Sequence, residues 1–125
     1  MGTISIQTKL CPGHTPGTTS FFFYDRDDSG QTYLCGMHGG SGTQFLQRAV
    51  LEEYGYPQTL RERFIADCRE MAEWPVDICL TSHPNQNNLL SGVNEKDPAD
   101  FSGFVSRASW KDFMLERAQD AENQL

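Results

Sequence analysis

The fold of this chain is decided by residues 12–23, which read Pro12-Gly13-His14-Thr15-Pro16-Gly17-Thr18-Thr19-Ser20-Phe21-Phe22-Phe23. The two prolines and two glycines prevent a helix or strand from continuing through residues 11–17, so this part is expected to be a rigid loop. The β-branched and aromatic residues that follow predict a strand over 18–24. The segment therefore places one histidine, His14, on a stiff loop that leads into a strand.

The residues on either side predict an α+β domain in the order β-β-β-α-α-β-α. Strands are expected at residues 3–10, 18–24, 31–36 and 76–81, from β-favouring residues and alternation or from a continuous apolar run. A turn at 25–30 joins two of these strands into a hairpin. Helices are expected at 44–53, with Ser41 or Thr43 as the cap, at 59–73, and from 109 to the C-terminus. This pattern predicts a mixed sheet with helices on one face.

Length and composition fit one small domain over residues 1–125. The net charge is −7 and the ten basic residues are scattered, so nucleic acid is not expected as a partner. No apolar run approaches the length of a bilayer span, so no membrane partner is expected either. No secretory leader precedes the first predicted strand, and the cellular location stays open.

The cysteines are expected to be free and buried. They have no Cys-x-x-Cys spacing, which argues against a thiolate zinc cage. Most of them fall in or beside apolar strand-like or helical stretches, where a free thiol packs like a small apolar side chain. The four residues are Cys11, Cys35, Cys68 and Cys79.

His14 and His83 are the candidate metal ligands. His83 follows the apolar strand predicted at 76–81 and precedes Pro84, so it also stands at a strand end in a stiffened loop. A ligand on a rigid backbone loses less entropy when it binds a metal. For a histidine taken singly, a hydrogen bond to its own turn is the simpler explanation. The residue pattern alone leaves both interpretations open.

Three segments together resemble the metallo-β-lactamase superfamily of zinc hydrolases. Residues 12–23 are similar to the segment that supplies the third histidine of the first zinc site, a place matched here by His14. Residues 77–84 resemble the later strand and the histidine of the second zinc, matched by His83. Residues 33–36 resemble the strand that leads to another ligand of the site. The resemblance covers most of residues 3–90 and is nearest to the third subclass of metallo-β-lactamases.

The resemblance implies the C-terminal half of the family's four-layer αββα sandwich. It also implies zinc in the complete protein, where the metal lowers the pKa of a bound water and the resulting hydroxide attacks an amide, ester or thioester carbonyl, including that of a β-lactam. The loop after the third strand borders the active site in such proteins, so Gly39, Gly40 and Ser41 are expected near the substrate. The fold does not choose among the substrates.

The chain departs from the family pattern in two respects. The main signature, His-x-His-x-Asp-His, is absent, and His14, His38 and His83 are the only histidines. Most metal ligands are therefore missing, so no catalytic residue is assigned and the chain need not bind zinc alone. In addition, Met37 stands where relatives often have Asp, Cys or Ser, and a thioether suits zinc poorly. His38 is the remaining candidate for that place, although adjacent residues leave a strand in opposite directions.

Two functions stay open. The first is a fragment of a zinc-dependent hydrolase that is inactive without its N-terminal half, so whether the chain is an enzyme depends on that half. The second is a non-catalytic, stand-alone domain that pairs with a second copy as a homodimer. The self-association rests on the expectation that Phe21, Phe23 and Tyr33 form an apolar patch on an uncovered sheet face.

Overall fold

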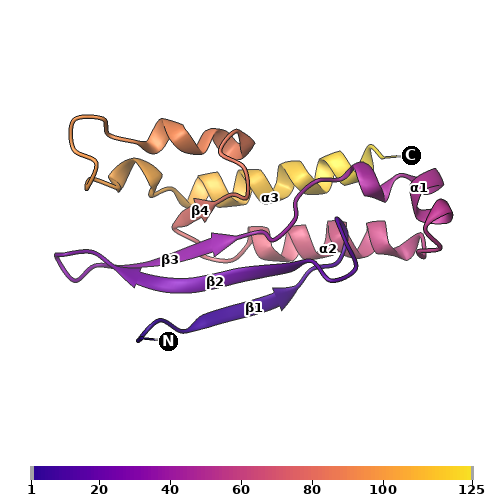
Figure 1. The fold of residues 1–125 in the computed structure, drawn as a ribbon, viewed down its shortest axis with the longest axis horizontal. Coiled ribbons are helices and arrows are strands. Elements are labelled where there is room, and N and C mark those ends of the chain that lie inside the picture. The colour runs from indigo at the N-terminus through magenta and orange to yellow at the C-terminus, as the bar shows by residue number, and fades with distance from the viewer. Residues whose placement is uncertain (1, 125) are drawn as a thin grey trace.

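A four-stranded sheet carries the two longest helices of the chain on one face in the computed structural model, which describes residues 2–124 (Figure 1). The strands lie side by side in sequence order: β1 (Ile6–Leu10), β2 (Thr19–Arg26), β3 (Thr32–Met37) and β4 (Ile78–Leu80). The first three are antiparallel, and β4 runs parallel to β3. The predicted α+β class, with a mixed sheet and helices on one face, is confirmed.

The helices are α1 (Arg48–Glu53), α2 (Thr59–Ala72) and α3 (Arg107–Glu122), with short 3₁₀ turns at Gln44–Leu46, Gln86–Gly92 and Ser102–Phe104. The prediction of one helix over 44–53 is wrong, because Gln47 adopts extended angles (φ −63°, ψ 141°) that separate the first 3₁₀ turn from α1. Thr43 stands at the start of that turn without a capping hydrogen bond from its side chain. No helix within residues 2–124 has the length and apolar character needed to cross a membrane.

One face of the sheet builds the main core. Strand alternation directs Phe22 toward the helices, where it is 2% exposed and its ring centroid lies 4.7 Å from that of Trp74. Trp110 of α3 closes the same cluster and donates an indole hydrogen bond of 2.7 Å to the carbonyl of Met71. The four cysteines are free and buried, as predicted.

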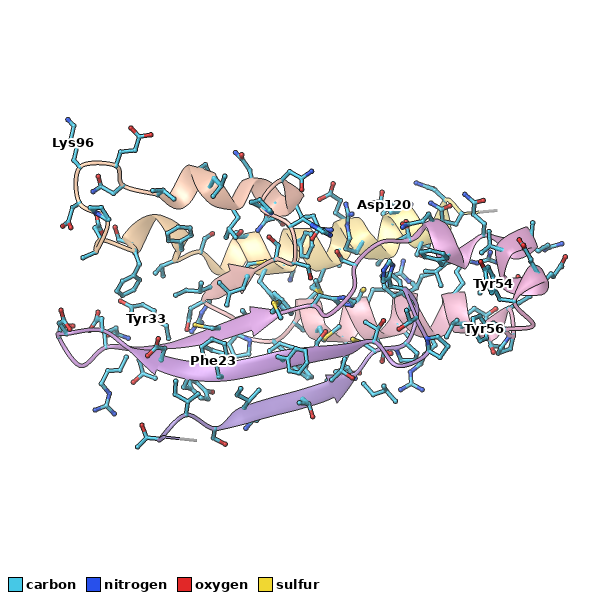
Figure 2. The ribbon with its side chains drawn as sticks, viewed as in Figure 1. Phe23, Tyr33, Tyr54, Tyr56, Lys96 and Asp120 are labelled. Atoms are coloured by element: carbon cyan, nitrogen blue, oxygen red, sulfur yellow. The ribbon has the colours of Figure 1, made fainter. Side chains whose placement is uncertain are left out.

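The opposite face of the sheet is open at β1 and covered over β3, where Cys35 is 5% exposed. Strand register places Ile6, Phe21, Phe23, Cys35 and Met37 on one side. Ile6 is 59% exposed and Leu10 54%, while Phe23 and Tyr33 are half-buried (Figure 2). Phe101, next to the last 3₁₀ turn, packs edge-on against Tyr33 at 5.4 Å, and with Leu89 and Phe104 it lines a cavity over β3 and β4. The expected apolar face is therefore present in the described chain.

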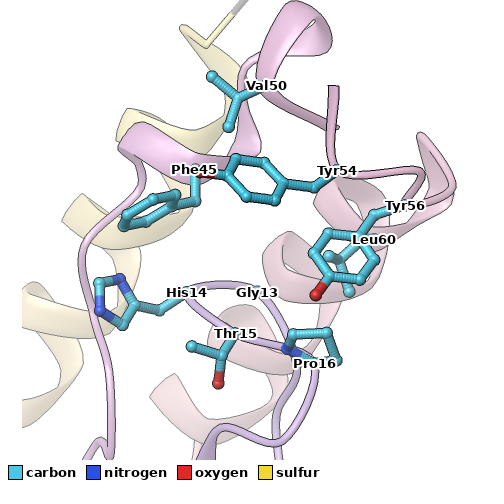
Figure 3. Close-up of a pocket in the computed structure, with 9 residues that line it drawn as sticks. All are labelled: Gly13, His14, Thr15, Pro16, Phe45, Val50, Tyr54, Tyr56 and Leu60. Carbon is cyan, nitrogen blue, oxygen red and sulfur yellow. The ribbon is translucent and has the colours of Figure 1, made fainter. Parts of the chain in front are cut away.

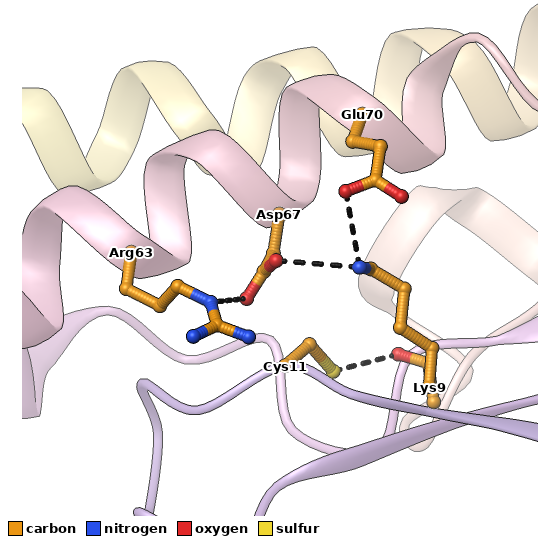
Figure 4. Close-up of polar contacts among 6 residues, drawn as sticks. Lys9, Cys11, Arg63, Asp67 and Glu70 are labelled. Carbon is orange, nitrogen blue, oxygen red and sulfur yellow. Dashed lines mark hydrogen bonds and ion pairs between the residues drawn. The ribbon is translucent and has the colours of Figure 1, made fainter.

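An ion-pair cluster fastens the edge strand β1 to α2 (Figure 4). Lys9 lies 3.4 Å from the carboxylate of Asp67 and 3.1 Å from that of Glu70. Arg63 donates to the other oxygen of Asp67 at 2.9 Å. Because the Asp67 side chain is only 6% exposed, this cluster is a buried link between the sheet edge and the helix layer.

Candidate metal centre

The loop that carries His14 joins β1 to β2 and is held by its own backbone. The amide of Cys11 donates to the carbonyl of Thr18 at 2.8 Å, and the amide of Gly13 donates to the carbonyl of Thr15 at 3.0 Å. The Thr18 hydroxyl accepts a further bond from the amide of Thr15 at 3.0 Å. These bonds close the rigid loop that its prolines and glycines predict, and they fix the base of His14.

The ring of His14 has a defined hydrogen-bonding state. Its Nδ1 lies 3.2 Å from the carbonyl oxygen of Gly42, and a carbonyl can only accept, so Nδ1 carries the proton. The lone pair of the neutral ring is then on Nε2. A ring oriented in this way by a backbone carbonyl is the form in which a histidine binds metal through Nε2.

The loop of residues 38–42 needs its glycines because it packs closely against the His14 loop. A Cβ on Gly39 would lie 1.9 Å from the carbonyl oxygen of Thr19, and a Cβ on Gly40 would lie 2.9 Å from the His14 ring. Both distances are too short for any side chain. The glycines therefore let the backbone approach His14 and supply the Gly42 carbonyl.

His14 and His83 line one cavity of about 400 Å³. His83 is exposed on the loop after β4, where the hydroxyl of Thr81 donates to its carbonyl at 2.8 Å. Gly39, Gly40 and Ser41 of the glycine loop line the same cavity. The structure thus brings together two of the three candidate ligands and the loop assigned to the substrate side.

His38 lies elsewhere. It is 2% exposed and packs edge-on against Phe64 of α2 at 5.6 Å, and it is not among the residues that line the cavity. Its Nδ1 accepts the amide of Gly40 at 3.2 Å. Burial lowers the pKa of His38 to about 4. Through this hydrogen bond the His38 ring holds the glycine loop from the core side, and its place as a metal ligand stays a prediction.

Arg117 is a cavity residue that sequence reasoning missed. It comes from α3 and lines the same cavity as the two histidines. Its guanidinium pairs with Asp120 at 2.8 Å, and its buried Nε has no partner in the part of the chain that the structure describes. Nothing in the local sequence marks this arginine, because the cavity joins segments that are far apart along the chain.

The donor set of this chain does not fit a complete zinc site. Within residues 2–124, no group of three or more His, Cys, Asp or Glu side chains is placed to hold a metal ion. A catalytic zinc generally takes three protein ligands and keeps one position open. The cavity offers two imidazoles, so any further ligands would have to come from outside the described residues.

Comparison with known structures identifies the fold. No family model matches the sequence, and neither does any curated protein. A β-lactamase from Chitinophaga pinensis is similar over 99% of this chain and 46% of its own, with a TM-score of 0.75 and 23% identity. A subclass B3 metallo-β-lactamase of Bradyrhizobium japonicum matches with a TM-score of 0.77 and 19% identity, over 99% of this chain and 46% of that enzyme.

A class B3 di-zinc metallo-β-lactamase from an Alaskan soil metagenome is similar over the whole of this chain and 46% of its own, with a TM-score of 0.76 and 18% identity. The chain therefore has the metallo-β-lactamase fold over about half the length of the structures that it matches. This agrees with the C-terminal half that the sequence predicted. Identities at this level establish the fold, and the activity has to be argued from the site.

Proposed function

We propose that this chain is the C-terminal part of a zinc-dependent hydrolase of the metallo-β-lactamase type, with His14 serving one zinc site and His83 an adjacent one. The observation that carries the proposal is the shared cavity, where histidines from two distant loops meet at one end of the sheet. The Gly42 carbonyl, which leaves Nε2 of His14 free, supports the same assignment.

The remaining ligands are assigned to a segment outside this chain, because two imidazoles do not make a catalytic site. Zinc, when bound in the complete protein, would supply a water of lowered pKa for attack on a carbonyl. The chain's own residues orient the two imidazoles and shape the cavity wall. Arg117 adds a positive charge at the same cavity. The chain is expected to be inactive by itself.

The test mixes the chain with a separately expressed N-terminal segment that carries His-x-His-x-Asp-His. Bound zinc is measured by mass spectrometry and nitrocefin hydrolysis by absorbance. The mixture should bind zinc stoichiometrically, and His14→Ala and His83→Ala should each reduce the bound zinc. Tyr24→Ala, an exposed residue on β2, is the matched control. Zinc binding that is equal in both histidine variants and the original chain would refute the assignment.

A second candidate function is a non-catalytic domain that pairs with itself. The open sheet face favours it, because Ile6 and Leu10 are more than half exposed on that face and contiguous apolar surface of this kind marks an interaction site. Light scattering distinguishes the two candidates. A stable homodimer that excludes the N-terminal segment would support self-association, whereas a monomer that takes up the segment would support the hydrolase fragment.

A further inference from the structure

A second cavity lies beside His14, outside the candidate metal centre (Figure 3). Its volume is about 300 Å³. The walls are mainly apolar and come from the His14 loop, the first 3₁₀ turn, α1 and the start of α2. The side chains that matter are Pro16, Phe45, Val50, Tyr54, Tyr56 and Leu60.

Three aromatic side chains of this cavity are partly exposed to solvent. Phe45 is 41% exposed, Tyr54 61% and Tyr56 42%. The two tyrosine rings are nearly parallel, with an interplanar angle of 14° and centroids 6.4 Å apart. Large aromatic side chains that stay partly in water around a concave site are typical of a binding surface.

The chemistry of the lining defines what fits. No carboxylate, lysine or arginine is among the lining residues, so the cavity favours an uncharged, apolar group. An apolar cavity of about 150 Å³ is enough to hold benzene. The cavity here has about twice that volume, which accommodates one aromatic ring with a short linker. Stacking or edge-on contact with the tyrosines and Phe45 favours a planar ring over an aliphatic group of the same size.

The cavity and the candidate metal centre share one lining residue. His14 lines both cavities, and its ring packs edge-on against Phe45 at 5.3 Å. A molecule with its ring between Phe45 and the tyrosines therefore has its linker beside His14. The next polar groups along that path belong to the glycine loop and His83.

We propose that this aromatic cavity is an aryl-binding subsite, which takes the aromatic group of an arylacetyl-type amide or ester whose carbonyl lies at the metal centre. The identity of the reacting group rests on the proposed hydrolase function. Binding of the aryl group itself uses only residues of this chain and needs no metal.

The experiment uses the full 125-residue chain in the presence of a chelator. Phenylacetamide and acetamide, which differ only in the phenyl group, are titrated while the methyl signals of Val50 and Leu60 are followed by NMR. Phenylacetamide should shift these signals in a saturable way, and acetamide at equal concentration should not. Equal shifts from both amides, or no shift from phenylacetamide, would overturn the subsite.

Two variants make the test specific. Tyr54→Ala and Tyr56→Ala should each weaken phenylacetamide binding by roughly fivefold to tenfold, since each removes one aromatic wall. Tyr24→Ala, which removes an equally exposed tyrosine on β2, should leave it unchanged. Both target side chains are exposed, and amide spectra report whether the variants remain folded. Binding that survives both substitutions would overturn the proposal.

The outcomes separate this inference from the function on which it rests. If phenylacetamide binds and the tyrosine variants weaken it, the subsite stands, even where mixing with the N-terminal segment restores no zinc. If the mixture with the N-terminal segment binds zinc but the chain does not bind phenylacetamide, the hydrolase assignment stands and the aryl subsite is refuted.

Discussion

His14 and His38 carry the same imidazole in two different environments. His14 is half-buried and donates Nδ1–H to a carbonyl, which leaves Nε2 as a donor atom for a metal. His38 is fully buried and accepts through Nδ1 from the Gly40 amide, so its proton is on Nε2, which has no partner among the described residues. The first ring has its Nδ1 bonded to the Gly42 carbonyl, and the second ring bonds the Gly40 amide of the same glycine loop.

The buried His38 predicts a specific pH dependence of stability. In the unfolded chain the imidazole takes up a proton near its ordinary pKa of 6.5, whereas burial lowers the pKa in the folded chain to about 4. Protons therefore favour unfolding between these values. The stability due to His38 is complete above pH 6.5 and declines as the pH falls toward 4, by about 3 kcal/mol in total. Urea unfolding across this pH range measures it.

His38→Gln is the control for this prediction, because glutamine keeps an acceptor but does not titrate. The difference between the two stability curves should shrink as the pH falls from 6.5 toward 4. Parallel curves over that range would show that His38 titrates alike in both states, which would contradict its burial.

At single residues, the sequence identified what is local. The stiff loop around His14 and the strand-end position of His83 follow from neighbouring prolines and glycines. The carbonyl that orients His14 comes from Gly42, and Arg117 reaches the cavity from the last helix. Such partners are set by tertiary packing, which has no local sequence pattern, so they could not be predicted.

At the scale of elements, the edge strand β1 depends on a buried charge. Asp67 accepts from Arg63 of its own helix and pairs with Lys9 of β1. Asp67 therefore bonds both the lysine of β1 and the arginine of α2. Lys9 also lies over the Trp74 ring at 5.8 Å, which adds a cation–π contact to the link.

Replacing Asp67 should loosen β1 from the helix layer. Asp67→Ala leaves Lys9 with Glu70 as its remaining carboxylate, and loss of one partner from a buried pair costs about 3–5 kcal/mol. Arg63→Ala removes an exposed partner of the same carboxylate and should cost less than about 1 kcal/mol. Urea unfolding gives both values, and hydrogen exchange in β1 locates the effect. If the two substitutions lowered the free energy of unfolding by the same amount, Asp67 would not be the main link between β1 and α2.

The two faces of β2 predict opposite responses to neighbouring substitutions. Phe22 packs between Trp74 and Trp110, so Phe22→Ala should destabilise the domain by about 3–5 kcal/mol. Phe21 lies on the open face and is half-buried, so Phe21→Ala should cost roughly 1 kcal/mol. Thermal or urea unfolding measures the pair. A larger loss from Phe21→Ala would mean that the open face is already covered.

Most elements could be predicted from periodicity, including the hairpin and the two long helices. The exception is the segment 44–53, where apolar spacing suggested one helix. The extended backbone of Gln47 divides it, and no residue there forbids a helix. The break lets Leu46 and Leu51 both reach buried positions, so tertiary packing overrides local propensity.

At the scale of the whole molecule, the chain is a sheet with one covered face and one open face. The solved structures with the same fold are about twice as long. The resemblance therefore predicts that the open face is where a second segment packs, and the same segment would bring the missing ligands to the cavity at the sheet end. Packing of that one segment would then both cover the open sheet face and complete the metal site.

The most direct test of this account is a Zn²⁺ titration of the 125-residue chain, followed by the imidazole NMR signals of its three histidines. The signals of His14 and His83 should each move only at zinc concentrations above about micromolar, because this chain supplies a single imidazole to each of the two adjacent sites. His38 should not respond, and His83→Ala should leave the response of His14 in place. Tight stoichiometric binding by the chain alone, or a response of His38 together with the other two, would contradict the account.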